Sequence, residues 1–241
     1  MQLKTSGIIL KNTRIGDKKI ISKIYTQNRG LQTFAIQVGT TPQSKIKPAH
    51  VQALNLVELD VMSNENQEIG RVQEIRVFHP FREINFNVMK NCISSFINEA
   101  LLKSLRETEA NPTMFEFVKN SLVELDEHPK NFGAWHLYFL MNLSRLIGFF
   151  PHDNFSKNHP FFNLLDGVFE SIPPQHANYF DREDSLYFHQ LIREYELYKN
   201  TPPVYQVRNR QLHLLIQYFR CHIPGFTDFK TLPVLHATLH D

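Results

Sequence analysis

One short segment near the N-terminus combines side chains that suit the binding of a nucleic acid. Residues 18–25 are rich in Ile and have the composition of a β-strand, in which every second side chain points to the same face. Lys19, Lys23 and Tyr25 would therefore share one face. Two cations beside an aromatic ring suit phosphate groups and stacked bases. A single exposed lysine more often serves only solubility, so the hypothesis depends on the charges around this strand.

The surrounding charges favour the hypothesis, because the basic residues are concentrated near the beginning of the chain. The 241 residues include 26 basic and 24 acidic ones, which gives a net charge of only +2. Residues 1–47 hold nine basic residues and one acid, Asp17, whereas residues 81–198 hold ten basic and sixteen acidic ones. A surface that serves solubility normally mixes both signs. A segment of nearly one sign therefore indicates a binding face for a polyanion.

We predict that the cations of this basic segment bind the phosphates of DNA. Tyr25 and Phe34 would stack on bases if their rings are exposed. The predicted DNA-binding residues of the segment are Arg14, Lys18, Lys19, Lys23, Tyr25, Arg29, Phe34, Lys45 and Lys47.

A second group of cations lies on a predicted helix over residues 205–222. Its apolar residues follow helical spacing, which leaves a polar face with Arg210 and Arg220, and Arg208 lies near the start of the helix. We include these three arginines among the candidate DNA contacts. An ordinary solvated helix face is an equally open interpretation of the same pattern.

The sequence contains no recognisable catalytic motif. It has no Gly-rich phosphate-binding loop, no G-x-S-x-G elbow and no H-E-x-x-H pair. Cys92 and Cys221 are too few for a disulfide framework or a multi-cysteine zinc site. His236 and His240 have the i, i+4 spacing of a helical metal pair, but they lie at the C-terminus, where fraying is expected. We expect neither an enzyme nor a bound metal or cofactor.

Two further features bear on the location of the protein. The longest apolar run is far shorter than the roughly 20 residues that a membrane helix needs. The first seven residues lack the apolar core of a secretory signal. We therefore expect a cytoplasmic protein that does not enter a membrane.

The elements that must position the cations divide the chain near residue 80. Before it, short stretches rich in Ile, Val, Leu and Thr are separated by turn residues at 15–17, 28–30 and 63–66. The predicted strands cover residues 5–11, 18–25, 31–38, 51–61 and 69–78. Five strands in so short a segment favour a small closed barrel, because closure removes exposed sheet edges. Periodicity alone leaves an SH3-like barrel as the competing topology.

After residue 80 the apolar residues recur with the period of helices. A wide apolar stripe begins near Val88 and predicts a helix of about 20 residues. Pro112, Pro129 and Pro151 then separate helix-sized blocks, because proline is tolerated in the first turn of a helix but not in its interior. The further predicted helices cover residues 113–125, 132–147, 182–198, 205–222 and 229–239. The predicted organisation is a barrel domain over residues 1–80 and a helical domain over residues 81–241.

Several segments form an ordered series along the chain. Near the N-terminus a strand, a polar turn and a second strand that ends in Tyr25-Thr26 are followed by Gly30. Residues 132–151 form a predicted helix that ends in a turn with Gly148 and Pro151. The other segments of the series are residues 38–45 and 208–235. The series resembles the RecO family of bacterial DNA-repair and recombination-mediator proteins.

The resemblance implies an N-terminal five-stranded OB-fold and a helical C-terminal domain. It implies a non-enzymatic, nucleoid-associated protein that binds single- and double-stranded DNA and anneals complementary strands. With its partner RecR, such a protein would help to load the RecA recombinase onto single strands coated with single-strand-binding protein, whose C-terminal tail it would contact. The alternative is a protein-interaction adaptor whose helical domain docks partner tails, with DNA binding secondary.

The chain departs from the family pattern in the region of residues 151–181. Many family members carry a four-cysteine zinc module after the Gly-aromatic-Pro turn, but this region contains no cysteine. We therefore expect a degenerate module without zinc. The side chains predicted to hold it by apolar packing are Phe155, Phe161, Phe162 and Phe169.

Overall fold

The computed structural model describes the chain except for residues 1, 63–68, 107–108, 227 and 240–241. The predicted turn at 63–66 and His240 therefore lie outside the described residues. The chain forms two compact units. The first contains Met1–Phe86 and Ser104–Asp126, and the second contains Asn87–Lys103 and Glu127–Asp241. The division into domains at residue 80 stays a prediction.

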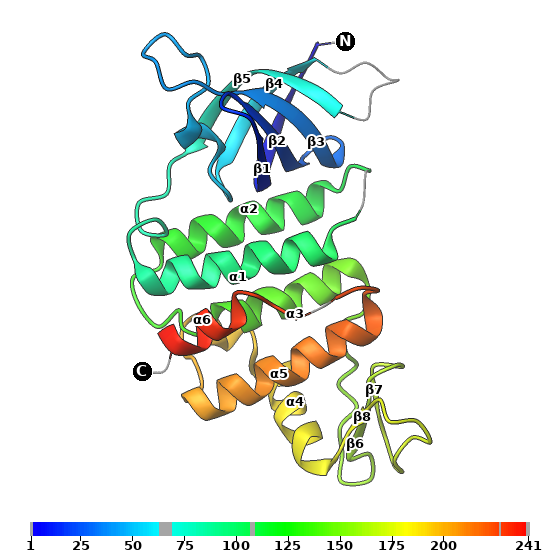
Figure 1. Cartoon of the computed structure of the whole chain (residues 1–241). Coiled ribbons are helices and arrows are strands. Elements are labelled where there is room, and N and C mark those ends of the chain that lie inside the picture. The colour runs from blue at the N-terminus through cyan, green and yellow to red at the C-terminus, as the bar shows by residue number, and fades with distance from the viewer. Residues whose placement is uncertain (1, 63–68, 107–108, 227, 240–241) are drawn as a thin grey trace. The chain divides into compact units, whose positions relative to one another are not determined.

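Five strands of the first unit form a closed barrel (Figure 1). They are β1 (Gln2–Ile15), β2 (Lys19–Thr26), β3 (Gly30–Gln37), β4 (Leu56–Met62) and β5 (Ile69–His79). The order around the barrel is β1-β2-β3-β5-β4, with β4 closing onto β1. All neighbours are antiparallel except β3 and β5, which are parallel. This arrangement confirms the predicted OB-fold, and a short 3₁₀ helix, Pro48–Val51, joins its third and fourth strands.

The barrel interior is filled by aliphatic side chains from alternate strand positions. On β2, Ile20 and Ile24 are buried, whereas Lys19 and Lys23 are exposed, as strand alternation requires. Phe34 is the aromatic residue of this interior cluster. Its ring lies against Gly70 of β5, where an added Cβ atom would come within 2.9 Å of the ring. Glycine at this position therefore allows β5 to pass close to Phe34.

Helix α2 (Pro112–Glu127) belongs to the first unit up to Asp126. The ring of Phe115 lies 6.3 Å from the ring of Tyr25 on β2. At the other end of the helix, the buried carboxylate of Asp126 accepts backbone N–H groups from Arg82, Glu83 and Ile84 at 2.8–2.9 Å. These contacts fix α2 to the barrel and to the segment that follows β5.

The second unit is mainly helical (Figure 1). Its helices are α1 (Val88–Ser104, up to Lys103), α3 (Trp135–Ile147), α4 (Arg182–Glu194), α5 (Tyr205–His222) and α6 (Leu232–Thr238). The predicted helix over 182–198 ends early, and a 3₁₀ turn, Leu197–Lys199, follows it. Helix α3 ends at Gly148, whose left-handed φ of 98° lets its N–H reach the carbonyls of Ser144 and Arg145.

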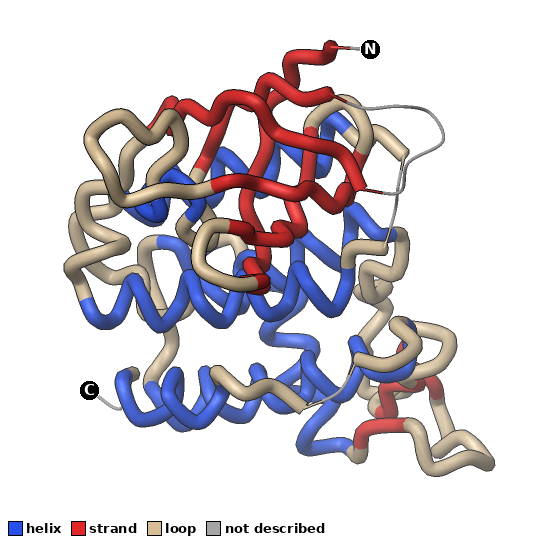
Figure 2. The backbone as a smooth tube through the Cα atoms, turned by 45° about the horizontal axis from the view of Figure 1, so that its top comes forward, coloured by secondary structure: helices blue, strands red, loops and turns tan. Residues whose placement is uncertain are grey.

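A small three-stranded sheet in the second unit was not predicted. It is formed by β6 (Phe161–Asn163), β7 (Val168–Glu170) and β8 (Tyr179–Phe180), in the order β7-β6-β8, and Figure 2 shows these strands as short red segments. Strands of two or three residues are too short to reveal alternation in a sequence.

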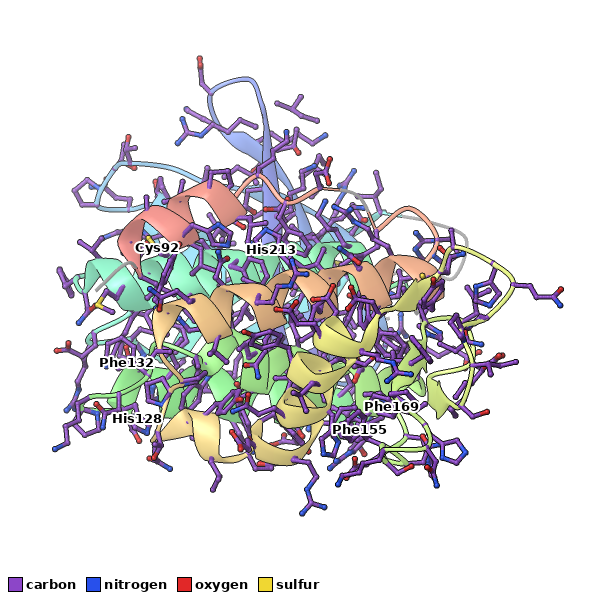
Figure 3. All side chains as sticks on the ribbon, turned by 90° about the horizontal axis from the view of Figure 1, so that it is seen from below. Cys92, His128, Phe132, Phe155, Phe169 and His213 are labelled. Atoms are coloured by element: carbon purple, nitrogen blue, oxygen red, sulfur yellow. The ribbon has the colours of Figure 1, made fainter. Side chains whose placement is uncertain are left out.

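Aromatic packing holds this sheet region, as predicted. The ring of Phe169 lies 4.8 Å from that of Phe162 and 5.3 Å from that of Phe155, and Figure 3 labels Phe155 and Phe169 close together. Phe161 lies at the edge of the cluster and is only half-buried. The side-chain amide of Asn154 adds a pair of hydrogen bonds to the backbone of Phe169, at 2.8 and 2.9 Å.

Candidate nucleic-acid interface

The predicted cations of β2 lie on the outer face of the barrel, between β1 and β3. Lys23 is directly opposite Lys11 of β1 on one side and Thr33 of β3 on the other. Lys19 is opposite Ile15 and Gln37 in the same way. Like charges directly opposite each other destabilise a sheet. The pair Lys11–Lys23 therefore carries a local cost that an anion would relieve.

A groove opens next to this face because β3 and β5 pair over only three residues. Their ladder ends at Ala35 and Arg71, and the hollow beyond it has a volume of about 420 Å³. Lys19, Gln37, Arg71 and Gln73 are among its lining residues.

A second hollow of about 590 Å³ continues this groove toward the turn between β1 and β2. The two hollows share Gln37 and Gln73. Its lining adds Arg14, Lys18 and Lys45. We call the combined hollow the basic groove and define it by Arg14, Lys18, Lys19, Lys45 and Arg71.

The positive charge of the basic groove is largely uncompensated. Asp17 is the one acid among the described residues that line it. Within the same part of the chain, Arg14, Lys18, Lys19 and Lys23 form no ion pair. Lys45 lies 3.8 Å from Glu74, but both side chains are mostly exposed, and such surface pairs contribute little energy. The groove therefore presents a positive potential to an approaching polyanion.

The two aromatic residues predicted to stack on bases are both buried, so the condition for that role is not met. Tyr25 does share the outer face with Lys19 and Lys23, but it has no exposed surface. The ring packs against Phe115 of α2, which covers this end of the strand. Phe34 points into the barrel interior.

Arg29 and Lys47 do not line the basic groove. Arg29 lies in the turn after β2, at the opposite end of that strand from Lys19, and is half-buried. Its backbone N–H donates to the hydroxyl of Thr26 at 3.2 Å. Lys47 is exposed and lies two residues beyond Lys45, just before the 3₁₀ helix.

The three arginines of α5 that were predicted to contact DNA are either buried or already paired with acidic residues. Arg208 is buried and donates to the carbonyl oxygen of Leu239, and burial lowers its pKa. It therefore does not face solvent, and Gly133 and the ring of Tyr205 also lie against its guanidinium. Arg210 and Arg220 are exposed as predicted, but each forms an ion pair, with Asp184 and Asp228 respectively.

Two cations of the barrel face were missed by sequence reasoning. Lys11 was counted in the basic segment but not assigned to a site, and its position opposite Lys23 requires the register of β1 and β2. Arg71 lies outside the basic segment and reaches the groove because β3 and β5 pair in parallel. A short parallel pairing between distant strands leaves no signal in the sequence.

A different hollow, on β1, β4 and β5 of the same barrel, has mixed charge. Its volume is about 540 Å³. Three acids, Glu58, Asp60 and Glu74, line it together with Lys4 and Arg76. We call it the mixed hollow. Asp60 is directly opposite Lys4 and Glu74, so its charges partly compensate one another and do not favour a polyanion.

The groups with strongly shifted pKa values lie in the second unit, where burial explains the shifts. Burial lowers the pKa of His136 to about 3, so this histidine is neutral at pH 7. Among the described residues, no three His, Cys, Asp or Glu side chains gather closely enough to hold a metal ion. The described helices also include none with the length and apolar character needed to cross a membrane.

Comparisons with known proteins identify a family that matches most of the chain. The family model described as Recombination protein O N terminal matches residues 1–81, and the one described as Recombination protein O C terminal matches residues 87–155. The chain belongs to the RecO family. Curated RecO relatives cover nearly its whole length. Those of Phocaeicola vulgatus, Bacteroides fragilis and Flavobacterium psychrophilum are each 31% identical, over 98% of both chains. Each of these relatives is named DNA repair protein RecO.

Proposed function

We propose that this RecO-family protein binds single- and double-stranded DNA through the basic groove and anneals complementary strands during DNA repair and recombination. The observation that carries the proposal is the uncompensated charge of Arg14, Lys18 and Lys19 on an OB-fold barrel. OB-folds bind oligonucleotides on the face of their second and third strands and in adjacent loops. The basic groove lies beside that face.

Counterion release supplies the driving force of this interaction. Each phosphate that a lysine or arginine neutralises frees condensed counterions, so the affinity falls as salt rises. This term does not depend on base sequence, and it acts on single strands as well as on duplexes. A groove that holds phosphates therefore fits a protein that meets both forms of DNA.

Annealing follows from neutralisation of the same charges. Two complementary strands repel each other through their phosphates, and a cationic surface that binds both reduces this repulsion. The relatives' name, DNA repair protein RecO, supports a role in repair. We extend the proposal to cooperation with RecR, contact with the tail of single-strand-binding protein, and loading of RecA.

A second candidate function, a protein-interaction adaptor, is favoured by the surface of the second unit. The outward arginines of α5 already have acidic partners. Large apolar side chains such as Leu186, Leu197 and Val204 are more than half exposed there. Such a surface suits contacts with proteins better than contacts with phosphates.

Charge reversal on the barrel face tests the proposal. The double variant Lys18→Glu, Lys19→Glu should bind an oligo(dT) roughly tenfold or more weakly in low salt, because two phosphate contacts of the basic groove become repulsive. Fluorescence anisotropy of a labelled oligonucleotide measures this affinity.

The matched control makes the same change of charge on the mixed hollow. Lys4→Glu, Arg76→Glu alters two cations of the same barrel outside the basic groove. Its affinity should change by no more than about twofold, which is the size expected when charges beyond the contact are screened. Equal losses in both variants would mean that net charge, and not the groove, sets the affinity.

A further inference from the structure

The barrel is nearly free of aromatic side chains that could stack on a base. Residues 1–80 contain only Tyr25, Phe34 and Phe78 of the types Phe, Tyr and Trp. Tyr25 and Phe34 are buried, against α2 and in the barrel interior. Phe78 is half-buried near the end of β5, seven residues beyond Arg71 of the groove. The segment 63–68 contains no aromatic residue either.

The exposed apolar side chains that the structure describes on this part of the barrel are not aromatic. Ile15 is opposite Lys19 and is 53% exposed. Ile69 is opposite Thr33 at the start of the β3–β5 ladder and is 45% exposed. Met62, which lines the groove next to Arg71, is also half-exposed. Such groups can pack against sugars, but they offer no π-face to a base.

Building on the proposed function, we propose that the barrel holds DNA by its sugar–phosphate backbone and leaves the bases unstacked by protein. Proteins that bind single strands on aromatic platforms must release each base before it can pair. A barrel in which Tyr25 and Phe34 are buried in its own packing, with Phe78 outside the lining of the groove, imposes no such step. A bound strand would display its bases to a complementary strand while the lysines and arginines neutralise both backbones.

The direct test compares two oligonucleotides of equal length and charge on the full chain. One is oligo(dT) of about 20 nucleotides, and the other has abasic sites in place of every thymine. A single base stacked on an aromatic ring corresponds to roughly a 5- to 150-fold gain in affinity. Backbone binding predicts that the two affinities agree within about threefold, whereas an advantage of tenfold or more for oligo(dT) would overturn the inference.

A chemical probe of the bound bases gives an independent readout. Permanganate oxidises thymines that are not covered by a stacked ring. Thymines in the saturated complex should react as fast as in the free oligonucleotide, and clear protection would overturn the inference even at equal affinities. If neither oligonucleotide binds, the proposed function itself fails, and the inference fails with it. This outcome can be distinguished from a preference for oligo(dT) or a protection of thymines, because in those two cases the protein still binds DNA.

Discussion

The basic groove of the barrel and the outward side of α5 carry the same kinds of cation but use them differently. In the groove, Arg14, Lys18 and Lys19 are exposed and have no acidic partner among the described residues. On α5, Arg210 and Arg220 are exposed but paired. Binding an anion in the groove therefore adds favourable contacts, whereas binding one on α5 must first break ion pairs.

Arg208 shows a third use of the same side chain. It lies within the second unit, and its guanidinium donates to the carbonyl of Leu239 at the end of α6, where a cation complements the helix dipole. Gly133 leaves room for it, because an added Cβ atom there would come within 2.9 Å of Nη1. Whether a lysine or arginine is available to bind DNA therefore depends more on its partners within the protein than on the number of positive charges nearby.

Among the variants that test this difference between the groove and α5, we expect the largest loss of DNA affinity when several charges of the groove are reversed. The triple variant Arg14→Glu, Lys18→Glu, Arg71→Glu should lower the affinity for oligo(dT) by roughly 100-fold or more in low salt, because three contacts are replaced by repulsion. Circular dichroism should show an unchanged fold, since all three side chains are exposed. A well-folded variant that still binds as tightly as the native protein would remove the groove from the interface.

Replacing the buried arginine should affect stability and leave DNA affinity nearly unchanged. Arg208→Ala removes a hydrogen bond from a charged donor to a buried carbonyl, so we expect a loss of about 2 kcal/mol in the free energy of unfolding. Thermal unfolding measures it, with Arg210→Ala as the exposed control. A loss of DNA affinity at unchanged stability would contradict the structural role of Arg208.

The smallest effect is expected for the paired arginines. Arg210→Ala, Arg220→Ala should change the affinity for oligo(dT) by less than about twofold, because these cations are already compensated by Asp184 and Asp228. Anisotropy under the same conditions as for the groove variants gives the comparison. A tenfold loss would show that α5 contributes to the DNA interface and would remove the contrast between the two regions.

The sequence predicted what depends on neighbouring residues and missed what depends on distant ones. Strand alternation placed Lys19, Lys23 and Tyr25 on one face correctly. It could not show that Phe115, ninety residues later, packs against Tyr25, or that Arg208 is buried and donates to the carbonyl of Leu239. The barrel and the bounds of α5 follow from local patterns, whereas Arg71 reaches the groove only through the closure of the barrel.

The same distinction explains the region of residues 151–181. Its phenylalanines indicated apolar packing, and Phe162 and Phe169 are indeed buried. The sheet that they stabilise stayed hidden, because two or three residues per strand carry no readable period. The hydrogen bonds between the Asn154 side chain and the backbone of Phe169 also stabilise this region, and they join residues fifteen positions apart that local propensity does not pair.

The salt dependence of single-strand binding tests the central claim most directly. If the five cations of the basic groove each neutralise one phosphate, the logarithm of the association constant should fall with the logarithm of the salt concentration with a slope of about −3.5. The triple groove variant should show a slope shallower by about 2. A native slope shallower than about −1, or an equal slope in the variant, would contradict the account that the basic groove binds DNA through phosphates.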